Sequence, residues 1–333
     1  MKISDTNSPL LVILAFLQAI VNCKSELRIL LDAKKQSLKA ILLNPSSQFT
    51  DLVSKCRSII VAGGTMQPVS EFQEQLFLAA GAKLEKITHF SCGHIVPPEN
   101  VMPLVVKTGP SGRTLDFTFQ SRDKPETYQE LGRCVINACT VIPGGVVVFF
   151  PSYDYEARVF EAFENNGVIE KIKQKKNVYR EPKKTSDMDA VLKNYSRSAR
   201  ASGAILFSVV GGKMSEGINF SDELGRCVIM VGLPFPNAHA PELKEKMSYL
   251  AANVAPNAGQ LHYENLCMKA VNQSIGRAIR HKNDYASILL LDHRYERSNI
   301  LNHLPEWIKT RVEICQGFGP VMGKLTRFFK SKK

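Results

Sequence analysis

The stretch from Gln273 to Arg280, which reads Gln-Ser-Ile-Gly-Arg-Ala-Ile-Arg, carries side chains suited to binding an anion. Apolar residues around it recur at close to helical spacing, so the sequence predicts a helix over 263–280. On such a helix Gln273, Arg277 and Arg280 would project from one face. A guanidinium stays charged and offers a planar fork of donors that fits phosphate oxygens. A solvated basic helix face is the alternative interpretation.

Three loops rich in glycine or polar residues follow apolar runs that are predicted to be strands. They are Gly63 to Pro68, Pro151 to Tyr153 and Gly211 to Phe220. Glycines let a backbone approach a ligand closely, and consecutive exposed amides form an anion-binding nest. Tyr153 has the ring to stack on a base and the hydroxyl to bond a phosphate. The alternatives are an ordinary glycine-rich turn and an aromatic that closes the core. A Walker A loop is absent from the sequence.

The charge balance favours an anionic partner. The 43 lysines and arginines exceed the 31 acidic residues and give a formal net charge of +12, which suits nucleic acid or ATP. Basic stretches at Lys171–Lys184 and Lys324–Lys333 would add phosphate contacts, or would simply be solvated charged surface. The eight cysteines include no Cys-x-x-Cys pair, so neither a zinc nor a redox motif is indicated. We interpret them as reduced thiols of an intracellular protein.

The N-terminus resembles the apolar region of a secretory signal. Pro9–Val21 is apolar except for Gln18. Asp5 in the preceding head and a helical stripe of leucines and valine (Leu10, Leu14, Leu17, Val21) favour a packed helix instead. The run is shorter than the roughly 20 residues that a membrane span needs, and no membrane partner is expected.

The pattern of elements changes near residue 111. The earlier part predicts helix over 8–43 with a break at 22–26, a turn at 44–47, a buried strand at 58–62, a helix at 69–80 and a connector over 86–114 with a strand at 104–107. The later part predicts strands 115–119, 146–150, 204–210, 227–231 and 286–292 alternating with helices 126–141, 153–164, 186–201, 241–252 and 263–280. This alternation predicts an α/β fold with a parallel sheet covered on both faces. In such sheets ligands bind beyond the carboxyl ends of the strands.

Taken together, these segments resemble the C-terminal part of a superfamily 2 iron–sulfur DNA helicase of the XPD/FANCJ type. Gly63–Met66 resembles motif III, Phe149–Tyr153 motif IV, Gly211–Phe220 motif V and Gln273–Arg280 motif VI, in the family's order. Asn219 stands where relatives often have Asp. Longer stretches resemble the Chl-type branch, the animal sister-chromatid-cohesion helicases: Ser8–Ile13, Ala15–Ala19, Gly63–Ser70, Ser91–His94 and Asn272–His281.

The resemblance implies two RecA-like (P-loop NTPase-type) domains that clamp ATP and move along DNA. Residues 1–110 would be the C-terminal remnant of the first motor domain, and 111–333 the second. In the family the first domain carries Walker A, an Asp-Glu-x-His box for Mg²⁺ and four cysteines for an iron–sulfur cluster. None of these is in the sequence, and Asp222–Gly225 is not that box.

The resemblance also implies a role for each motif residue. Arg280, as first choice for the arginine finger, and Arg277 would be catalytic. The nucleotide would be bound by Gln273, Gly276, Glu216, Gly217 and Asn219. DNA would be contacted by Ser152, Tyr153, Lys213 and Ser215, and the two domains would be coupled through Gly64 and Thr65. No metal ligands are expected within the chain.

The implied activity is ATP-dependent unwinding of DNA in the nucleus. The substrates would be single strands and forked duplexes, and the setting DNA repair and sister-chromatid cohesion, with cohesion or replication proteins as partners. An arginine finger without a phosphate loop has little to act on, so we expect these 333 residues alone to be inactive. The alternatives are a truncated, non-catalytic nucleic-acid-binding or interaction module, and an incomplete gene product of an ordinary helicase.

Overall fold

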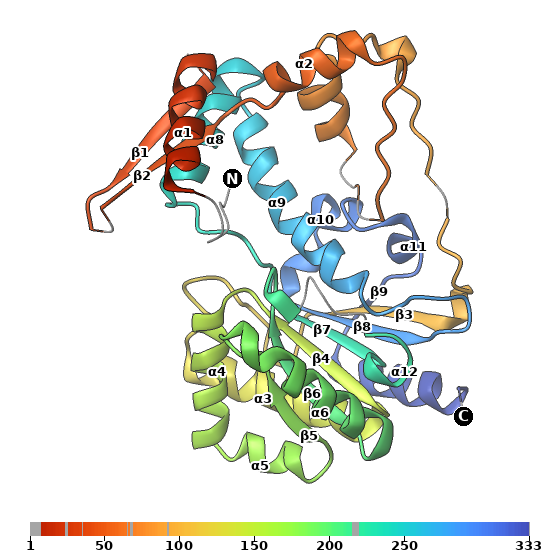
Figure 1. The fold of residues 1–333 in the computed structure, drawn as a ribbon. Coiled ribbons are helices and arrows are strands. Elements are labelled where there is room, and N and C mark those ends of the chain that lie inside the picture. The colour runs from red at the N-terminus through yellow and green to blue at the C-terminus, as the bar shows by residue number, and fades with distance from the viewer. Residues whose placement is uncertain are drawn as a thin grey trace. The chain divides into compact units, whose positions relative to one another are not determined.

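The computed structural model describes residues 8–23, 26–34, 36–64, 66, 69–91, 93–214 and 220–332 (Figure 1). The chain forms two compact units. One comprises Met1–Phe90 and Pro236–Asn265, and the other Ser91–Phe235 and Leu266–Lys333. This division differs from the boundary expected at residue 110. Strand β3 (Val101–Val106) is hydrogen-bonded to two strands of the second unit and therefore belongs to it.

The second unit is built on one sheet of seven strands. Their order is β5-β6-β4-β7-β8-β3-β9, and every pairing is parallel. Besides β3 the strands are β4 (Gly145–Phe150), β5 (Asn177–Arg180), β6 (Ala204–Val209), β7 (Cys227–Val231), β8 (Ala286–Leu291) and β9 (Glu313–Cys315). Strands β4, β6, β7 and β8 are buried along their whole length, as continuous apolar runs predict. The predicted α/β class is confirmed.

Helices cover both faces of this sheet (Figure 1). Each face of the sheet has its own hydrophobic core. The side chains of β4 alternate between them, with Val146 and Val148 in the first core and Val147 and Phe149 in the second. The first core is closed by α3 (Pro125–Val141), α4 (Tyr153–Asn165), α5 (Val168–Lys173) and α12 (Phe318–Lys330). The second is closed by α6 (Met188–Ala201), α9 (Ala258–Ile275), α10 (Ser298–Asn302) and α11 (Glu306–Lys309). The short helical turns are η4 (Pro98–Asn100), η5 (Thr185–Asp187), η6 (Asp222–Leu224) and η7 (His293–Glu296).

The first unit contains a hairpin that the sequence interpretation missed. Its elements are α1 (Pro9–Cys23), β1 (Leu27–Asp32), β2 (Ser37–Leu42), α2 (Ser46–Lys55), the π-helix η2 (Glu71–Leu78), η3 (Leu84–Lys86) and α8 (Pro241–Asn253), with the first half of α9. The predicted helix to residue 43 is wrong beyond α1, because β1 and β2 pair antiparallel. Ion pairs of Arg28 with Glu245 and of Lys39 with Glu242 link the hairpin to α8. The predicted helix at 69–80 is confirmed as η2, and Gly81 follows it with φ +93°.

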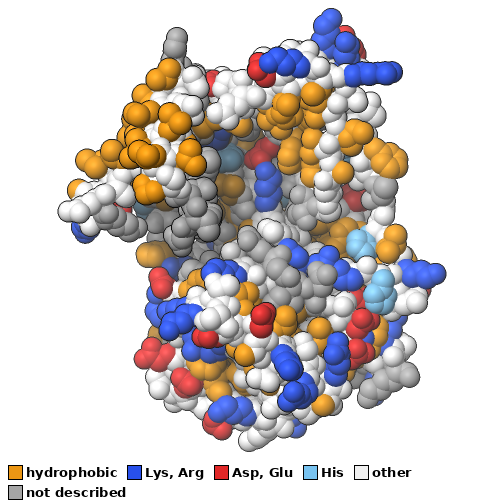
Figure 2. All heavy atoms as spheres, in the orientation of Figure 1, with side chains coloured by type: hydrophobic (Ala, Val, Ile, Leu, Met, Phe, Trp, Pro, Cys, Tyr) orange, Lys and Arg blue, Asp and Glu red, His pale blue; other side chains and the backbone are white. Residues whose placement is uncertain are grey.

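The helix α1 forms as predicted, but its apolar stripe is not packed. Leu10, Leu14, Leu17 and Val21 are 76%, 51%, 52% and 70% exposed. Figure 2 shows the corresponding cluster of hydrophobic side chains at its upper left, over α1 and the hairpin. No helix within the described residues is both long and apolar enough to cross a bilayer.

Two other predicted strands do not form. Residues 58–62 make no strand and are largely exposed, with Ile60 88% exposed. A buried parallel strand needs neighbours on both sides, and the described residues supply none here. Residues 115–119 form no strand: they follow the isolated bridge Thr108↔Thr114, and the chain enters a turn at 118–119. Leu115 and Phe117 are nevertheless buried, because this segment lies against the end of β8.

Lys176 is a buried cation in the turn before β5. It is 4% exposed, and its Nζ donates a hydrogen bond to the carbonyl oxygen of Gly144 at 2.7 Å. Burial lowers the pKa of Lys176 below its ordinary 10.5, an effect that Cys139 and Cys227 oppose. The Gly144 oxygen also accepts the N–H of Ala204, so it keeps a partner when the lysine is replaced.

Lys176→Met is expected to raise the free energy of unfolding at pH 7 by on the order of 1 kcal/mol, because it removes a buried charge. A lowered pKa in the folded protein means that the unfolded chain binds more protons, so wild-type stability rises with pH from that lowered pKa up to 10.5. The advantage of the variant should therefore shrink as the pH approaches 10.5 in urea unfolding series. Lys173→Met, at a half-exposed site, is the control. A variant less stable than wild type at pH 7 would contradict the expectation.

Candidate functional site

The segment that carries the two motif VI arginines is a turn. Helix α9 ends at Ile275, so the predicted helix to residue 280 is wrong over its last five positions. The N–H groups of Arg277 and Ala278 bond to carbonyls only three residues back, at 3.2 and 3.1 Å, which tightens the chain out of the α-helix. Gln273 remains on the helix and is exposed, while Arg277 and Arg280 leave it. The three side chains therefore do not share one helix face.

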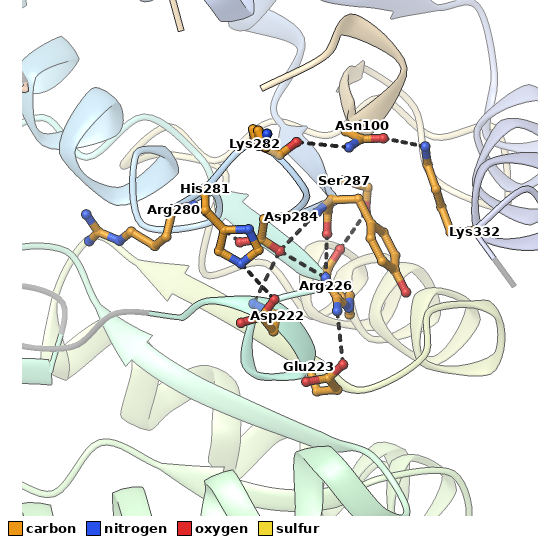
Figure 3. Close-up of polar contacts among 11 residues, drawn as sticks. Asn100, Asp222, Glu223, Arg226, Arg280, His281, Lys282, Asp284, Ser287 and Lys332 are labelled. Atoms are coloured by element: carbon orange, nitrogen blue, oxygen red, sulfur yellow. Dashed lines mark hydrogen bonds and ion pairs between the residues drawn. The ribbon is translucent and has the colours of Figure 1, made fainter. Parts of the chain in front are cut away.

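Arg277 and Arg280 lie close enough to repel each other electrostatically. Burial and the charge of Arg277 together hold the pKa of Arg280 below its usual range. Neither guanidinium makes an ion pair or side-chain hydrogen bond with another residue that the structure describes. Figure 3 shows the Arg280 side chain directed away from the nearby carboxylates. Two neighbouring cations of this kind are suited to bind an anion with several oxygens.

A buried carboxylate, Asp284, holds this turn in place (Figure 3). Its Oδ2 accepts the backbone N–H of Arg280 at 3.3 Å. Its Oδ1 accepts the backbone N–H groups of Asp222 at 3.2 Å and Tyr285 at 2.9 Å, and also Nη1 of Arg226 at 3.0 Å. Burial raises the pKa of Asp284, while Arg226 and the backbone N–H groups of Arg280 and Tyr285 oppose that rise. One side chain thus joins the Arg280 turn to the segment before β7.

The Asp222 end of this connection is strained. Asp222 has φ 55°, a left-handed conformation that is uncommon for a residue other than glycine. Its N–H is bonded to Asp284, and its Oδ1 lies 2.9 Å from Nε2 of His281, the residue after Arg280. The turn is therefore attached to the Asp222 segment at two points, through Asp284 and through His281.

Asp222, His281 and Asp284 also offer atoms of the types that bind a divalent cation, all within 4.8 Å of one another. Their surroundings do not fit Mg²⁺. Both oxygens of Asp284 already accept hydrogen bonds, and Oδ1 faces the Arg226 guanidinium, which would repel a cation. We interpret the three residues as a brace for the arginine turn. Within the described residues no other group of this composition is present, and this one contains no cysteine.

Three of the four predicted DNA-contacting residues, Ser152, Tyr153 and Lys213, are described, and they follow the carboxyl ends of β4 and β6. Ser152 caps α4, and its Oγ accepts the N–H of Tyr155 at 3.2 Å. Tyr153 donates its hydroxyl to Oε1 of Glu181 at 2.7 Å, and burial and Glu181 raise its pKa to about 12. The Lys213 ammonium donates to Oγ1 of Thr185. These side chains are engaged within the fold, so their first role is to hold the strand-end loops.

Glu181 is the centre of this second arrangement. Its carboxylate accepts the hydroxyl of Ser208 at 2.6 Å and the N–H groups of Val209 and Met214 at 3.0 and 3.2 Å, besides the Tyr153 hydroxyl. A Cβ on Gly212 would collide with the same carboxylate, which explains the glycine at this close approach. Glu181 therefore connects the loops that follow β4, β5 and β6.

The two arrangements lie at opposite edges of the sheet. Arg226 directly precedes β7 and Asp284 stands two residues before β8, whereas Ser152 and Gly211 follow β4 and β6. Because all the strands are parallel, the first pair marks the amino edge and the second the carboxyl edge. The sequence predicts that ligands bind beyond the carboxyl ends of the strands. The arginine turn lies at the opposite edge and does not follow that prediction.

The family described as the helicase C-terminal domain matches residues 135–311, more than half of the chain. The chain belongs to this family. The ATP-dependent DNA helicase DDX11 of Danio rerio is 48% identical over 342 residues, which are 98% of this chain and 38% of that protein. The ATP-dependent DNA helicase CHL1 of Scheffersomyces stipitis is 44% identical over 99% of this chain and 41% of its own length. The chain thus spans about two fifths of these curated relatives.

A solved structure of an XPD helicase has the same fold as this chain. It is 19% identical, with a TM-score of 0.61, and the match covers 91% of this chain and 50% of that one. The resemblance to the XPD/FANCJ type and its Chl-type branch, and the RecA-like fold, are confirmed.

The residues of the helicase C-terminal domain fit part of an ATP site. The guanidiniums of Arg277 and Arg280, which have no acidic partner in the part of the chain that the structure describes, suit triphosphate oxygens. Several predicted residues lie outside the described ones: Thr65, Ser215, Glu216, Gly217 and Asn219. Gly64 is described and exposed, and Gly276 directly follows α9, where a Cβ would lie 3.1 Å from the Asn272 oxygen.

Sequence reasoning missed Glu181 and Asp284, the two buried carboxylates at the centres of these arrangements. Glu181 is the only acidic residue in the basic stretch from Lys171 to Lys184, and that isolation was the available signal. Asp284 stands four residues after Arg280, beyond the segment that resembles motif VI. No spacing rule connects it to Arg226 or Asp222, since they are 58 and 62 residues away.

Proposed function

We propose that this chain is the C-terminal motor segment of an ATP-dependent DNA helicase. The observation that carries the proposal is the pair of neighbouring guanidiniums, Arg277 and Arg280, with no acidic partner among the described residues of a helicase C-terminal domain. Arg280 contacts the triphosphate as the arginine finger, and Arg277 assists it. Gln273, Gly276 and the motif V residues Glu216, Gly217 and Asn219 complete the nucleotide contacts.

The other half of the nucleotide site is supplied by a first motor domain. That domain would bring the phosphate loop, the Mg²⁺ ligands and the family's iron–sulfur cluster. Residues 1–90 are the end of that domain, a shorter stretch than the expected 1–110, because β3 belongs to the second unit. Gly64 and Thr65 couple the two domains. The exposed apolar run at 58–62 supports this assignment, because it has the composition of a buried strand and no neighbours among the described residues.

DNA is bound along the carboxyl edge, by the loops after β4 and β6 that carry Ser152, Tyr153, Lys213 and Ser215. The natural substrates would be single-stranded and forked DNA. The names of the relatives support DNA as substrate and ATP as the source of energy. We place the protein in the nucleus, in DNA repair and sister-chromatid cohesion, with cohesion or replication proteins as partners.

The purified 333-residue chain is expected to bind a single-stranded oligonucleotide and to lack DNA-stimulated ATP hydrolysis. Binding measured by fluorescence anisotropy should weaken with salt, with a slope in log–log form of about −0.7 per phosphate contacted. It should not depend on ATP, because the phosphate loop is absent. If the purified chain hydrolyses ATP in a DNA-stimulated way and Arg280→Ala loses that activity, the proposal that the chain holds only half of the nucleotide site is wrong.

A fusion separates this proposal from a non-catalytic binding module. The N-terminal part of the Danio rerio relative, joined to this chain, should restore ATP hydrolysis if the arginine turn completes a nucleotide site. The same fusion with Arg277 and Arg280 both changed to alanine is the control. A well-folded fusion that binds DNA without hydrolysing ATP would favour the binding module.

A further inference from the structure

Phe119 is a large apolar side chain that the fold turns outward at the carboxyl edge of the sheet. It is the third member of the alternation Leu115, Phe117, Phe119, whose first two members are buried, at 1% and 5% exposed. Phe119 itself is 81% exposed. The alternation is broken by a tight turn in which the N–H of Arg122 bonds to the carbonyl oxygen of Thr118 at 2.8 Å.

The position of this segment on the sheet is fixed by contacts with two strand ends. The N–H of Phe117 donates to Oδ2 of Asp292, which directly follows β8, at 3.2 Å. A Cβ on Gly232, which directly follows β7, would lie only 2.7 Å from the Cβ of Phe117. Phe119 therefore stands at the same edge as the strand-end loops after β4 and β6.

A cation lies over the Phe119 ring. The Arg122 guanidinium carbon is 5.0 Å from the centroid of Phe119 and 5.2 Å from that of the buried Tyr155. Tyr155 also donates its hydroxyl to the Arg122 carbonyl oxygen at 3.1 Å, and its backbone N–H donates to the Ser152 Oγ described above. Arg122 is thus connected to the loop after β4 through one buried side chain, that of Tyr155.

The local charge is suited to a polyanion. Arg122 and Arg158 share a single carboxylate, Asp123, at 3.6 and 2.9 Å, which leaves a net positive charge beside the exposed ring. An exposed aromatic ring with an adjacent guanidinium offers a base its face and a phosphate its charge, the combination found in proteins that bind single strands.

We propose that Phe119, supported by Arg122, is a stacking platform for an unpaired nucleobase of single-stranded DNA. This inference rests on the proposed function, in that it extends the DNA path at the carboxyl edge from the β6 and β4 loops to the ends of β7 and β8. The base covers the exposed ring, and Arg122 holds the adjacent phosphate. Stacking is independent of base sequence, as translocation along DNA requires.

The test compares two ligands on the full 333-residue chain. Anisotropy is measured with a labelled oligothymidylate and with an abasic oligomer of the same length. Phe119→Ala should weaken oligothymidylate binding roughly five- to a hundred-fold and leave abasic binding unchanged. Phe119→Trp should retain the affinity, and its indole fluorescence should be quenched by the oligothymidylate. Phe90→Ala, at an equally exposed phenylalanine, is the matched control and should change neither.

Three results would overturn the inference. If wild type binds oligothymidylate and Phe119→Ala binds it equally well, the platform is wrong while the proposed function stands. If Phe119→Ala loses affinity for the abasic oligomer to the same degree, its role is not base stacking. If wild type binds neither ligand, the proposed DNA path fails, and the platform fails with it.

Discussion

Replacing Arg280 by alanine in a helicase that carries this chain is expected to reduce kcat for ATP hydrolysis by roughly 10³–10⁵-fold, the range seen for arginine fingers in phosphoryl transfer. The guanidinium has no acidic partner among the described residues, so its charge is available to the developing negative charge on the phosphoryl oxygens. Steady-state ATPase assays with saturating single-stranded DNA, on the fusion to the Danio rerio N-terminal part, measure the effect directly.

Two variants of the same fusion show whether the loss of kcat comes from the paired donors of the Arg280 guanidinium. Arg280→Lys keeps a charge but loses the planar pair of donors, so it should recover only part of the rate. Lys282→Ala removes an exposed cation two residues away and should leave kcat within about twofold, since exposed charges interact weakly through water. Equal losses in Arg280→Ala and Lys282→Ala would show a general field effect instead of a finger.

Asp284→Ala is expected to lower the free energy of unfolding by about 3–5 kcal/mol, the usual cost of removing one partner of a buried ion pair. The Arg226 side chain is 6% exposed and would lose the carboxylate at 3.0 Å. The backbone N–H groups of Asp222, Arg280 and Tyr285 would lose their acceptor in the same step. Urea unfolding of the 333-residue chain, followed by circular dichroism, gives the difference.

A second substitution identifies the source of that loss. Asp284→Ala leaves the buried Arg226 charge with the half-exposed Glu223 as its acidic partner, at 3.2 Å. Asp284→Ala/Arg226→Met removes that charge as well, so the double variant should be more stable than Asp284→Ala alone. Asp51→Ala, which breaks an exposed pair with Lys55, should cost far less than Asp284→Ala, because water screens that pair. A loss below about 1 kcal/mol in Asp284→Ala would show that the carboxylate does not brace the turn.

The arginine turn and the loops that Glu181 holds lie at opposite edges of the sheet, and one segment of chain runs between them. Motif V leaves β6 at the carboxyl edge and enters β7 at the amino edge, where Asp222 meets Asp284. The same segment of chain therefore connects the loop that Glu181 holds with the turn that carries Arg280. If Arg280 contacts nucleotide and the carboxyl edge contacts DNA, as proposed above, this segment is the stretch of chain that joins the two contacts.

The sequence by itself determined the family, the α/β class and most elements of the sheet. Continuous apolar runs such as Val146–Phe150 and Cys227–Val231 are buried strands as predicted, because a parallel strand covered on both faces leaves little choice of composition. The motif order also predicts Arg277 and Arg280 as site residues, since residue type and spacing within one short segment need no tertiary information.

Tertiary structure alone decided what surrounds those residues. The apolar spacing before Arg280 continues past Ile275, yet the helix ends there, and Asp284 accepts the Arg280 N–H in the turn that follows. The run at 58–62 has the composition of a buried strand and is exposed, because burial depends on neighbours that local sequence does not specify. Glu181 and Asp284 are hubs only because strands distant in sequence bring donors to them. Such contacts arise from chain topology, and no local pattern records them.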